Sequence, residues 1–160
     1  MVHMNQNNTH FLYPAALFAS REPYMINTIL GSCVAVCLYD PAMHIGGMTH
    51  YMLPLWNGEG LASPKYGNIA IEKLVEKMKH YGSRQANLKA KVFGGGEVIE
   101  VRDTYFNIGK RNIKMAYDTL AEYNIPVIGA STGGKLGRKL IFDTYTGQVK
   151  QRYVKRQDIQ

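Results

Sequence analysis

Two side chains that could perform nucleophilic catalysis, Cys33 and His50, lie seventeen positions apart in the first third of the chain. A histidine within hydrogen-bonding reach of a thiol can take its proton and leave a reactive thiolate. Cys33 follows Gly31 and Ser32 and opens an apolar run, which predicts a thiol at the mouth of a strand beside a flexible turn. Small residues there would let a substrate carbonyl approach, and main-chain N–H groups near Ser32 and Cys33 could donate to an oxyanion. The pattern raises the hypothesis of a cysteine nucleophile that a histidine activates.

Each of these residues also has a purely structural interpretation. Composition alone favours Cys33 as a small buried hydrophobic residue, and His50 is as readily a histidine whose ring nitrogens are satisfied within the fold. A zinc site is a third alternative, because four zinc-ligand side chains lie at short intervals: Cys33, Cys37, His44 and His50. Along one strand, however, Cys33 and Cys37 would stand about 13 Å apart, too far to share a metal ion. We therefore expect no metal or other cofactor, and we expect Cys37 to be a packed core residue.

The elements that must position these side chains are predicted to be strands. Residues 25–40 and 44–54 are two apolar runs separated by the turn-forming pair Asp40-Pro41, which predicts a β-hairpin-like pair. Residues 54–64 are rich in Gly, Pro, Ser and Asn and should form a loop. Further strands are predicted at 88–93, 126–130, 139–142 and 148–149, the last two as a hairpin across 143–147.

Two amphipathic helices should pack on these strands. The first is predicted from apolar residues at helical spacing before Gly82, namely Ile71, Leu74, Val75 and Met78. The second carries Ile113, Ala116, Tyr117 and Leu120 on one face, with Asn107 as its N-cap. Because strands outnumber helices and do not alternate strictly with them, we expect a compact α+β fold with mixed or antiparallel sheets.

Length and composition limit the remaining possibilities. A chain of 160 residues fits one domain, here 1–160, with about the first twenty residues as an N-terminal extension. The net charge of +7 comes without the clustered aromatic and basic pattern of a nucleic-acid module, so we expect no nucleic-acid partner. Neither a leader peptide nor a stretch of about 20 apolar residues is apparent, which favours a cytoplasmic protein without membrane insertion.

Two linked motifs resemble the signature of the CheD family. The first is LGSCVAVCLYD at residues 30–40, and the second is GGMTH at 46–50 followed by MLP at 52–54. The resemblance continues through shorter segments at 65–66, 93–96, 107–112, 132–134 and 137–138. It covers nearly the whole chain apart from the first twenty or so residues and the last few.

The resemblance implies a cysteine hydrolase that converts selected glutamines of methyl-accepting chemotaxis receptors to glutamates, with release of ammonia. Some family members also hydrolyse glutamate methyl esters. Cys33 matches the family's nucleophile and His50 its catalytic histidine, which is expected to hold Cys33 partly ionised. Gly31, Ser32 and Thr49, beside these two residues, are expected to bind the substrate.

The third catalytic position departs from the family pattern. The family commonly places a threonine six positions before the cysteine, where this chain has Asn27, followed by Thr28. An asparagine oxygen can accept a hydrogen bond from an imidazole N–H and orient the ring. Thr28 would point to the opposite face of a regular strand. We therefore expect Asn27 to be the orienting residue, with Thr28 as the alternative.

The resemblance also implies a second functional class. Family members pair with CheC, a phosphatase of the phosphorylated response regulator CheY, so an adaptor with little deamidase activity is the alternative function.

The glycine clusters at 94–96 and 132–134 do not fit the phosphate-binding P-loop pattern and are interpreted as turns and walls of the active-site groove.

Overall fold

The structure, a computed structural model, describes residues 8–97 and 107–155. Its elements, in chain order, are β1 (Thr9–Phe11), β2 (Leu17–Ser20), β3 (Met25–Leu30), β4 (Val34–Asp40), β5 (Ile45–Thr49), α1 (Gly67–His80), the 3₁₀ turn η1 (Gln85–Asn87), β6 (Lys89–Gly94), α2 (Ile108–Glu122), β7 (Val127–Thr132), β8 (Gly137–Asp143) and β9 (Val149–Val154).

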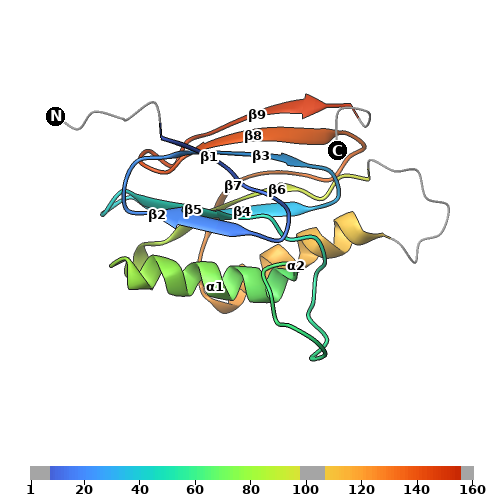
Figure 1. Cartoon of the computed structure of the whole chain (residues 1–160), viewed down its shortest axis with the longest axis horizontal. Helices are drawn as coiled ribbons and strands as arrows, with labels where there is room; N and C mark the ends of the chain where they lie inside the picture. The colour runs from blue at the N-terminus through green and yellow to red at the C-terminus, as the bar shows by residue number, and fades with distance from the viewer. Residues whose placement is uncertain (1–7, 98–106, 156–160) are drawn as a thin grey trace.

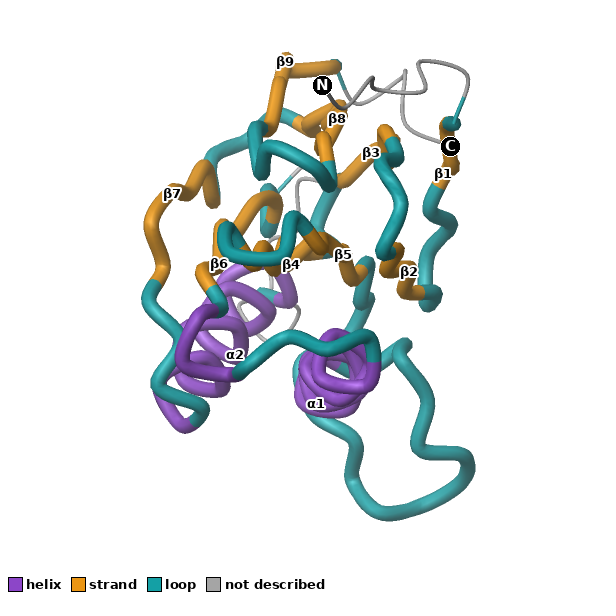
Figure 2. Tube along the Cα trace, turned by 90° about the vertical axis from the view of Figure 1, so that its left-hand side faces the viewer, coloured by secondary structure: helices purple, strands orange, loops and turns teal. Residues whose placement is uncertain are grey.

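These elements form three layers (Figure 1). Sheet A has the strand order β1-β3-β8-β9, and sheet B has the order β2-β5-β4-β6-β7. Sheet B lies in the middle, with sheet A on one face and both helices on the other, as the end-on view shows (Figure 2). Each sheet contains parallel and antiparallel pairs. The predicted α+β fold with two main helices and mixed sheets is confirmed.

Two hydrophobic clusters hold the layers together. Alternate residues of β4 point to opposite faces of sheet B, because side chains alternate along a strand. Val34, Val36 and Leu38 pack with the apolar faces of both helices. Ala35 and Cys37 instead pack against sheet A. The odd-numbered residues of β4 therefore line the space between the two sheets.

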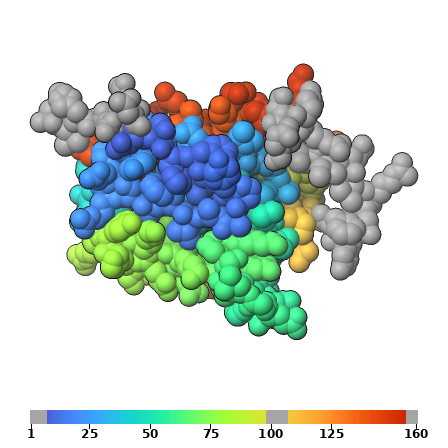
Figure 3. All heavy atoms as spheres, viewed as in Figure 1, coloured from blue at the N-terminus to red at the C-terminus, as the bar shows by residue number. Residues whose placement is uncertain are grey.

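Helix α1 follows the predicted spacing, because Ile71, Leu74, Val75 and Met78 are all buried against sheet B. Asn107 occupies the N-cap position of α2 as predicted, but its side chain makes no capping hydrogen bond. The loop before α1 stands away from the body of the molecule (Figure 1, Figure 3). No helix among the described residues is both long and apolar enough to span a bilayer.

The apolar run at 25–40 is not one strand. It divides at residues 31–33 into β3, which belongs to sheet A, and β4, which belongs to sheet B. The predicted hairpin across Asp40-Pro41 is confirmed as the antiparallel pair β4–β5. The predicted hairpin near the C-terminus is also confirmed, as β8–β9. The chain crosses from one sheet to the other at Cys33.

Part of the expected N-terminal extension belongs to the folded core. Strand β1 pairs parallel with β3, and β2 pairs antiparallel with β5. Leu12, between these strands, is fully buried. The expected extension is therefore wrong for residues 9–20, and residues 1–7 lie outside the described part of the chain.

Candidate active site

Cys33 lies in the turn that joins the two sheets, immediately before β4. Its side chain is partly buried and packs at the edge of the cluster between the sheets. The glycine segment after β6 holds this turn: Gly95 N donates to Cys33 O and Gly96 N to Gly31 O, both at 2.9 Å. The predicted place of the thiol, at the mouth of a strand beside a turn, is confirmed.

His50 follows β5 and faces the same inter-sheet space. The β4–β5 register continues beyond the strands as a bridge between Val34 and Tyr51, with both hydrogen bonds at 3.1 Å. Residues next to a bridged pair point to the other face of the sheet, so Cys33 and His50 share the face opposite Val34 and Tyr51. In this register the two are diagonal cross-strand neighbours, for which Cα atoms stand about 7–8 Å apart.

Among the described residues, no hydrogen bond joins the Cys33 thiol to the His50 ring. Catalytic hydrogen bonds often tighten only when substrate binds, so a shared face and diagonal register are compatible with a working pair. The structure places Cys33 and His50 on one face of the sheet. A hydrogen bond between them would have to form when substrate binds.

Thr28, on β3, makes a hydrogen bond with the imidazole of His50. Its Oγ1 lies 2.7 Å from His50 Nδ1 and donates to Leu12 O, also at 2.7 Å. A threonine hydroxyl has one hydrogen. Because that hydrogen goes to the Leu12 carbonyl, the hydroxyl must accept from His50 Nδ1–H. This tautomer leaves the lone pair of Nε2 free to take a proton.

The preference for Asn27 as the orienting residue is corrected by this geometry. Asn27 lies on the outer face of β3, and its side-chain amide donates to Met25 O at 3.3 Å. Thr28 lies on the buried inner face and reaches His50. The expectation that the two residues point to opposite faces is confirmed, but the face chosen for the site was wrong.

Burial keeps both reactive groups neutral near pH 7. Desolvation raises the pKa of the Cys33 thiol to about 11, against a smaller lowering by its own backbone N–H. Desolvation also lowers the pKa of His50 to about 4, against a smaller rise caused by the Leu12 carbonyl. The expectation of a partly ionised Cys33 is therefore wrong for the resting protein. The thiol and the imidazole are therefore both neutral near pH 7, and a neutral imidazole can act as a base.

The three residues expected to bind substrate have different environments. Ser32 is partly exposed beside Cys33, whereas Gly31 is buried and its carbonyl accepts from Gly96 N. Thr49 is fully buried, and its hydroxyl accepts a hydrogen bond from Val36 N at 3.0 Å. Thr49 thus has a structural partner, and Ser32 is the most accessible of the three.

Asn112, on α2, contacts the same turn and was not singled out from the sequence. Its Nδ2 donates to Ser32 O and to Met52 O, both at 3.0 Å. Tyr51 donates from its hydroxyl to the backbone carbonyl of Asn112. Asn112 therefore links α2 to the segments that carry Cys33 and His50. In the sequence, Asn112 is only one member of the 107–112 segment that resembles the CheD family.

The other zinc-ligand side chains have separate environments. Cys37 is buried in the inter-sheet cluster as predicted, and desolvation raises the pKa of its thiol well above the usual range. His44 stacks on Tyr145 with ring centroids 4.3 Å apart. Its Nδ1 also lies 3.1 Å from the Tyr39 hydroxyl. Cys37 and His44 therefore have packing and hydrogen-bond partners other than Cys33 and His50.

The glycine segment after β6 needs its glycines to approach the cysteine turn. Gly94 has a φ of +106°, and a Cβ there would stand 2.3 Å from Cys33 O. The loop at 132–134 lies against it, because Gly133 N donates to Gly94 O at 2.9 Å. The first glycine cluster therefore lies against the Cys33 turn and the second lies against the first. That they form walls of an active-site groove stays a prediction.

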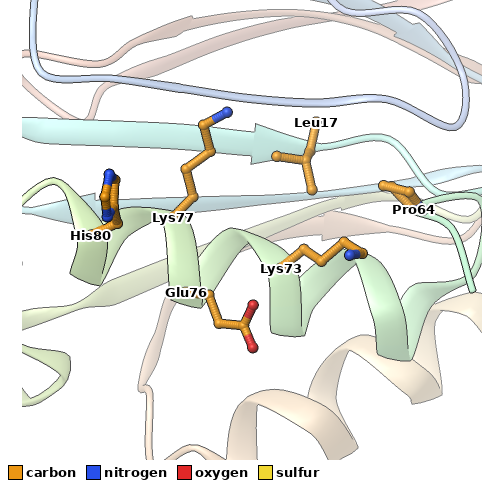
Figure 4. Close-up of a pocket in the computed structure, with 6 residues that line it drawn as sticks. All are labelled: Leu17, Pro64, Lys73, Glu76, Lys77 and His80. Carbon is orange, nitrogen blue, oxygen red and sulfur yellow. The ribbon is translucent and has the colours of Figure 1, made fainter.

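A surface depression lies between α1 and Leu17 of β2 (Figure 4). The lining residues are Leu17, Pro64, Lys73, Glu76, Lys77 and His80. Neither Cys33 nor His50 is among them, so this depression is not the site described above.

Comparisons with known proteins agree with the motifs. Residues 52–153 match the family model described as CheD chemotactic sensory transduction. A protein of Trichlorobacter lovleyi named "Probable chemoreceptor glutamine deamidase CheD" is 50% identical over 140 residues, 88% of this chain and 87% of that protein. A protein of the same name from Sulfurimonas denitrificans is 44% identical over 147 residues, 91% of this chain and 94% of its own length.

Positions 33 and 50 precede the segment that the family model matches. The alignment with the Trichlorobacter protein covers 88% of this chain, so it necessarily includes both positions. Among solved structures, the Bacillus licheniformis hypothetical protein YfiH has a TM-score of 0.48 at 15% identity, over 81% of this chain and 62% of that one. With the family model covering more than half of the chain and relatives this similar over most of it, the chain belongs to the CheD family.

Proposed function

We propose that this protein is a cytoplasmic chemoreceptor glutamine deamidase in which Cys33 is the nucleophile, His50 the general base and Thr28 the orienting residue. The names of its relatives support the reaction. The observation that carries the residue roles is the hydrogen-bonded chain from His50 Nδ1 through Thr28 to Leu12 O. That chain presents an unprotonated Nε2 on the face that also holds Cys33.

The reaction begins from neutral groups. As Cys33 Sγ attacks the carbonyl carbon of a glutamine carboxamide, a C–S bond forms and the thiol proton passes to His50 Nε2. The carbonyl oxygen becomes an oxyanion. Imidazolium His50 then protonates the departing nitrogen, the C–N bond breaks, and ammonia leaves a thioester on Cys33.

Hydrolysis of the thioester restores the protein. His50 takes a proton from water while the oxygen attacks the thioester carbon. Collapse breaks the C–S bond, the thiolate recovers its proton, and the product is a glutamate side chain. A methyl ester of glutamate would follow the same path with methanol as the leaving group. No step requires a cofactor.

The main-chain N–H of Cys33 is suited to hold the oxyanion. It lies against its own sulfur, where it lowers the pKa of the thiol. The carbon attacked by that sulfur would therefore carry its oxygen close to this N–H. Preorganised donors of this kind are commonly the largest contribution to acyl-transfer catalysis.

The experiment is mass spectrometry of a cytoplasmic fragment of a methyl-accepting chemotaxis receptor after incubation with the protein. We expect glutamine-to-glutamate conversion by the unmodified protein and by Cys37→Ala, a matched buried cysteine, and none by Cys33→Ala. Equal conversion by Cys33→Ala would exclude the proposed nucleophile. If no variant converts any of several receptors while binding to a CheC-type phosphatase is retained, the adaptor function replaces the deamidase.

A further inference from the structure

We propose that Asn112 is a positioning residue, which fixes the direction of the Cys33 N–H that receives the oxyanion. This inference rests on the proposed function, because it concerns the same acyl-transfer step. Helix α2 packs on sheet B against β4 and β6 (Figure 2). Through Asn112, this helix would then position a peptide group of the proposed active site.

The side chain of Asn112 holds two strands at once. It is fully buried, and both hydrogen bonds from its Nδ2 end on backbone carbonyls, one of Ser32 and one of Met52. Ser32 precedes the nucleophile. Met52 is directly opposite Cys33 in the register set by the bridge between Val34 and Tyr51. The amide therefore ties the nucleophile turn to the segment that follows His50.

The bond to Ser32 O acts on the N–H of Cys33 because both belong to one peptide group. A trans peptide is planar, and its C=O and N–H point in opposite directions. Holding the Ser32 carbonyl toward α2 therefore aims the Cys33 N–H away from α2, toward the face on which the thiol and His50 lie. Rotation of this peptide would remove the donor from the reacting centre.

The neighbouring peptide groups are held by other means. Gly96 N binds the carbonyl of Gly31, and Gly95 N binds that of Cys33. These bonds come from backbone, so no side-chain substitution removes them. Asn112 supplies the bond to the middle carbonyl, and it does so from a side chain. It is thus the contact through which the direction of the Cys33 N–H can be tested by mutation.

Burial of the Asn112 side-chain amide has an energetic cost. Asn112 Oδ1 is buried without a hydrogen-bond partner among the described residues. Leaving a buried acceptor unsatisfied costs about 1–3 kcal/mol. The donated bonds account for a polar residue on the buried face of α2.

The test uses a peptide in which an aldehyde replaces the glutamine carboxamide. Addition of the Cys33 thiol forms a C–S bond, and the carbonyl oxygen, after receiving the thiol proton through His50, becomes the hydroxyl of a hemithioacetal. Its affinity is measured by calorimetry for the unmodified protein, Cys33→Ala, Asn112→Ala and the shape-conserving Asn112→Asp. Thr119→Val is the matched control, because Thr119 is buried on the same helix and its hydroxyl contacts Met115. The alkylation rate of Cys33 and the receptor kcat and KM are measured on the same proteins.

We expect both Asn112 variants to lose at least about tenfold in adduct affinity and in kcat, since removing a direct oxyanion donor typically costs 10²–10³-fold. KM and the alkylation rate, which need no oxyanion donor, should stay within about twofold of the unmodified protein. Thr119→Val should match the unmodified protein throughout.

Two results overturn the inference while leaving the deamidase intact. One is an Asn112 variant that keeps adduct affinity and kcat. The other is a parallel loss of adduct affinity and alkylation rate, which would indicate general disruption of the turn. An unmodified protein that forms no Cys33-dependent adduct and converts no receptor would instead overturn the proposed function itself.

Discussion

In the proposed mechanism, the hydroxyl of Thr28 selects which nitrogen of His50 takes the proton. Thr28→Val keeps the shape of the side chain but removes the acceptor for Nδ1–H. A positioned general base contributes about 10²–10⁴-fold to a rate, and part of that depends on orientation. We expect kcat for receptor deamidation to fall about 10- to 100-fold in Thr28→Val. Asn27→Ala, on the outer face of β3, should keep its kcat, and the opposite ranking would restore Asn27 as the orienting residue.

The buried imidazole of His50 links stability to pH. Its pKa is lowered from 6.5 to about 4, so between these values the unfolded chain takes up a proton that the folded protein excludes. The stability contributed by neutral His50 is complete above pH 6.5 and is lost as the pH falls toward 4. The shift corresponds to about 3 kcal/mol.

Chemical denaturation of the unmodified protein and of His50→Gln at several pH values measures this effect. The difference between their unfolding free energies should change by about that amount between pH 7 and pH 4. A constant difference across the range would show that His50 titrates normally in the folded protein.

The nucleophile and base candidates could be predicted from the sequence, but the residue of β3 that contacts His50 could not. Cys33 and His50 stand out as a nucleophile and a base within recognisable motifs. In β3, however, Met25 and Ile29 flank Asn27 on one face, while Ile26 and Leu30 flank Thr28 on the other. Both faces look apolar, so alternation cannot show which one is buried. The answer depends on packing between the sheets.

At the scale of elements, the glycines at the end of β6 and just after it allow the chain to approach the Cys33 turn, where it crosses between the two sheets. A Cβ on Gly94 would clash with Cys33 O and would be strained at a φ of +106°. Gly134→Ala is the matched control, since Gly134 also has a positive φ, of +76°, but open space around its Cα. Strain of the backbone alone costs about 1–3 kcal/mol.

We expect Gly94→Ala to destabilise the protein by more than Gly134→Ala and to abolish most deamidation, because the Cys33 turn must move. Gly134→Ala should show only the cost of its backbone strain and retain turnover. Thermal unfolding and receptor conversion measure the two effects. Equal behaviour of the two variants would mean that the close approach at Gly94 is dispensable.

The helices and hairpins followed from local patterns, because apolar spacing and turn residues act within a few positions. Two features depended on distant contacts. Strands β1 and β2 have three and four residues, too few for a periodic signal, and they are strands because they pair with β3 and β5. The break at 31–33 was hidden because both β3 and β4 are apolar and face a shared core.

Across the whole molecule, Arg138 joins sheet A to sheet B near the site. It lies on β8 and is buried, and its guanidinium donates to Ser131 Oγ at 3.1 Å and to Gly133 O at 2.8 Å. It also lies 5.2 Å from the centroid of the Tyr153 ring. Hydrogen bonds from charged groups contribute about 1.5–3 kcal/mol each when they are well made.

We expect Arg138→Leu to lower the free energy of unfolding by roughly 2–4 kcal/mol, because two acceptors lose a charged donor. Lys139→Leu, one residue along on the opposite face of β8, should change it far less. Urea denaturation provides the comparison. A loss of the same size in both variants would show that Arg138 has no special part in holding the sheets together.

The most direct test of the account is capture of the thioester on Cys33. Receptor fragment is incubated with the protein in the presence of hydroxylamine, and its glutamine positions are analysed by mass spectrometry. A thioester divides between water and hydroxylamine, so the unmodified protein and Cys37→Ala should yield glutamate together with glutamyl hydroxamate at the same sites. Cys33→Ala should yield neither. Glutamate and hydroxamate formed equally well by Cys33→Ala would contradict the account.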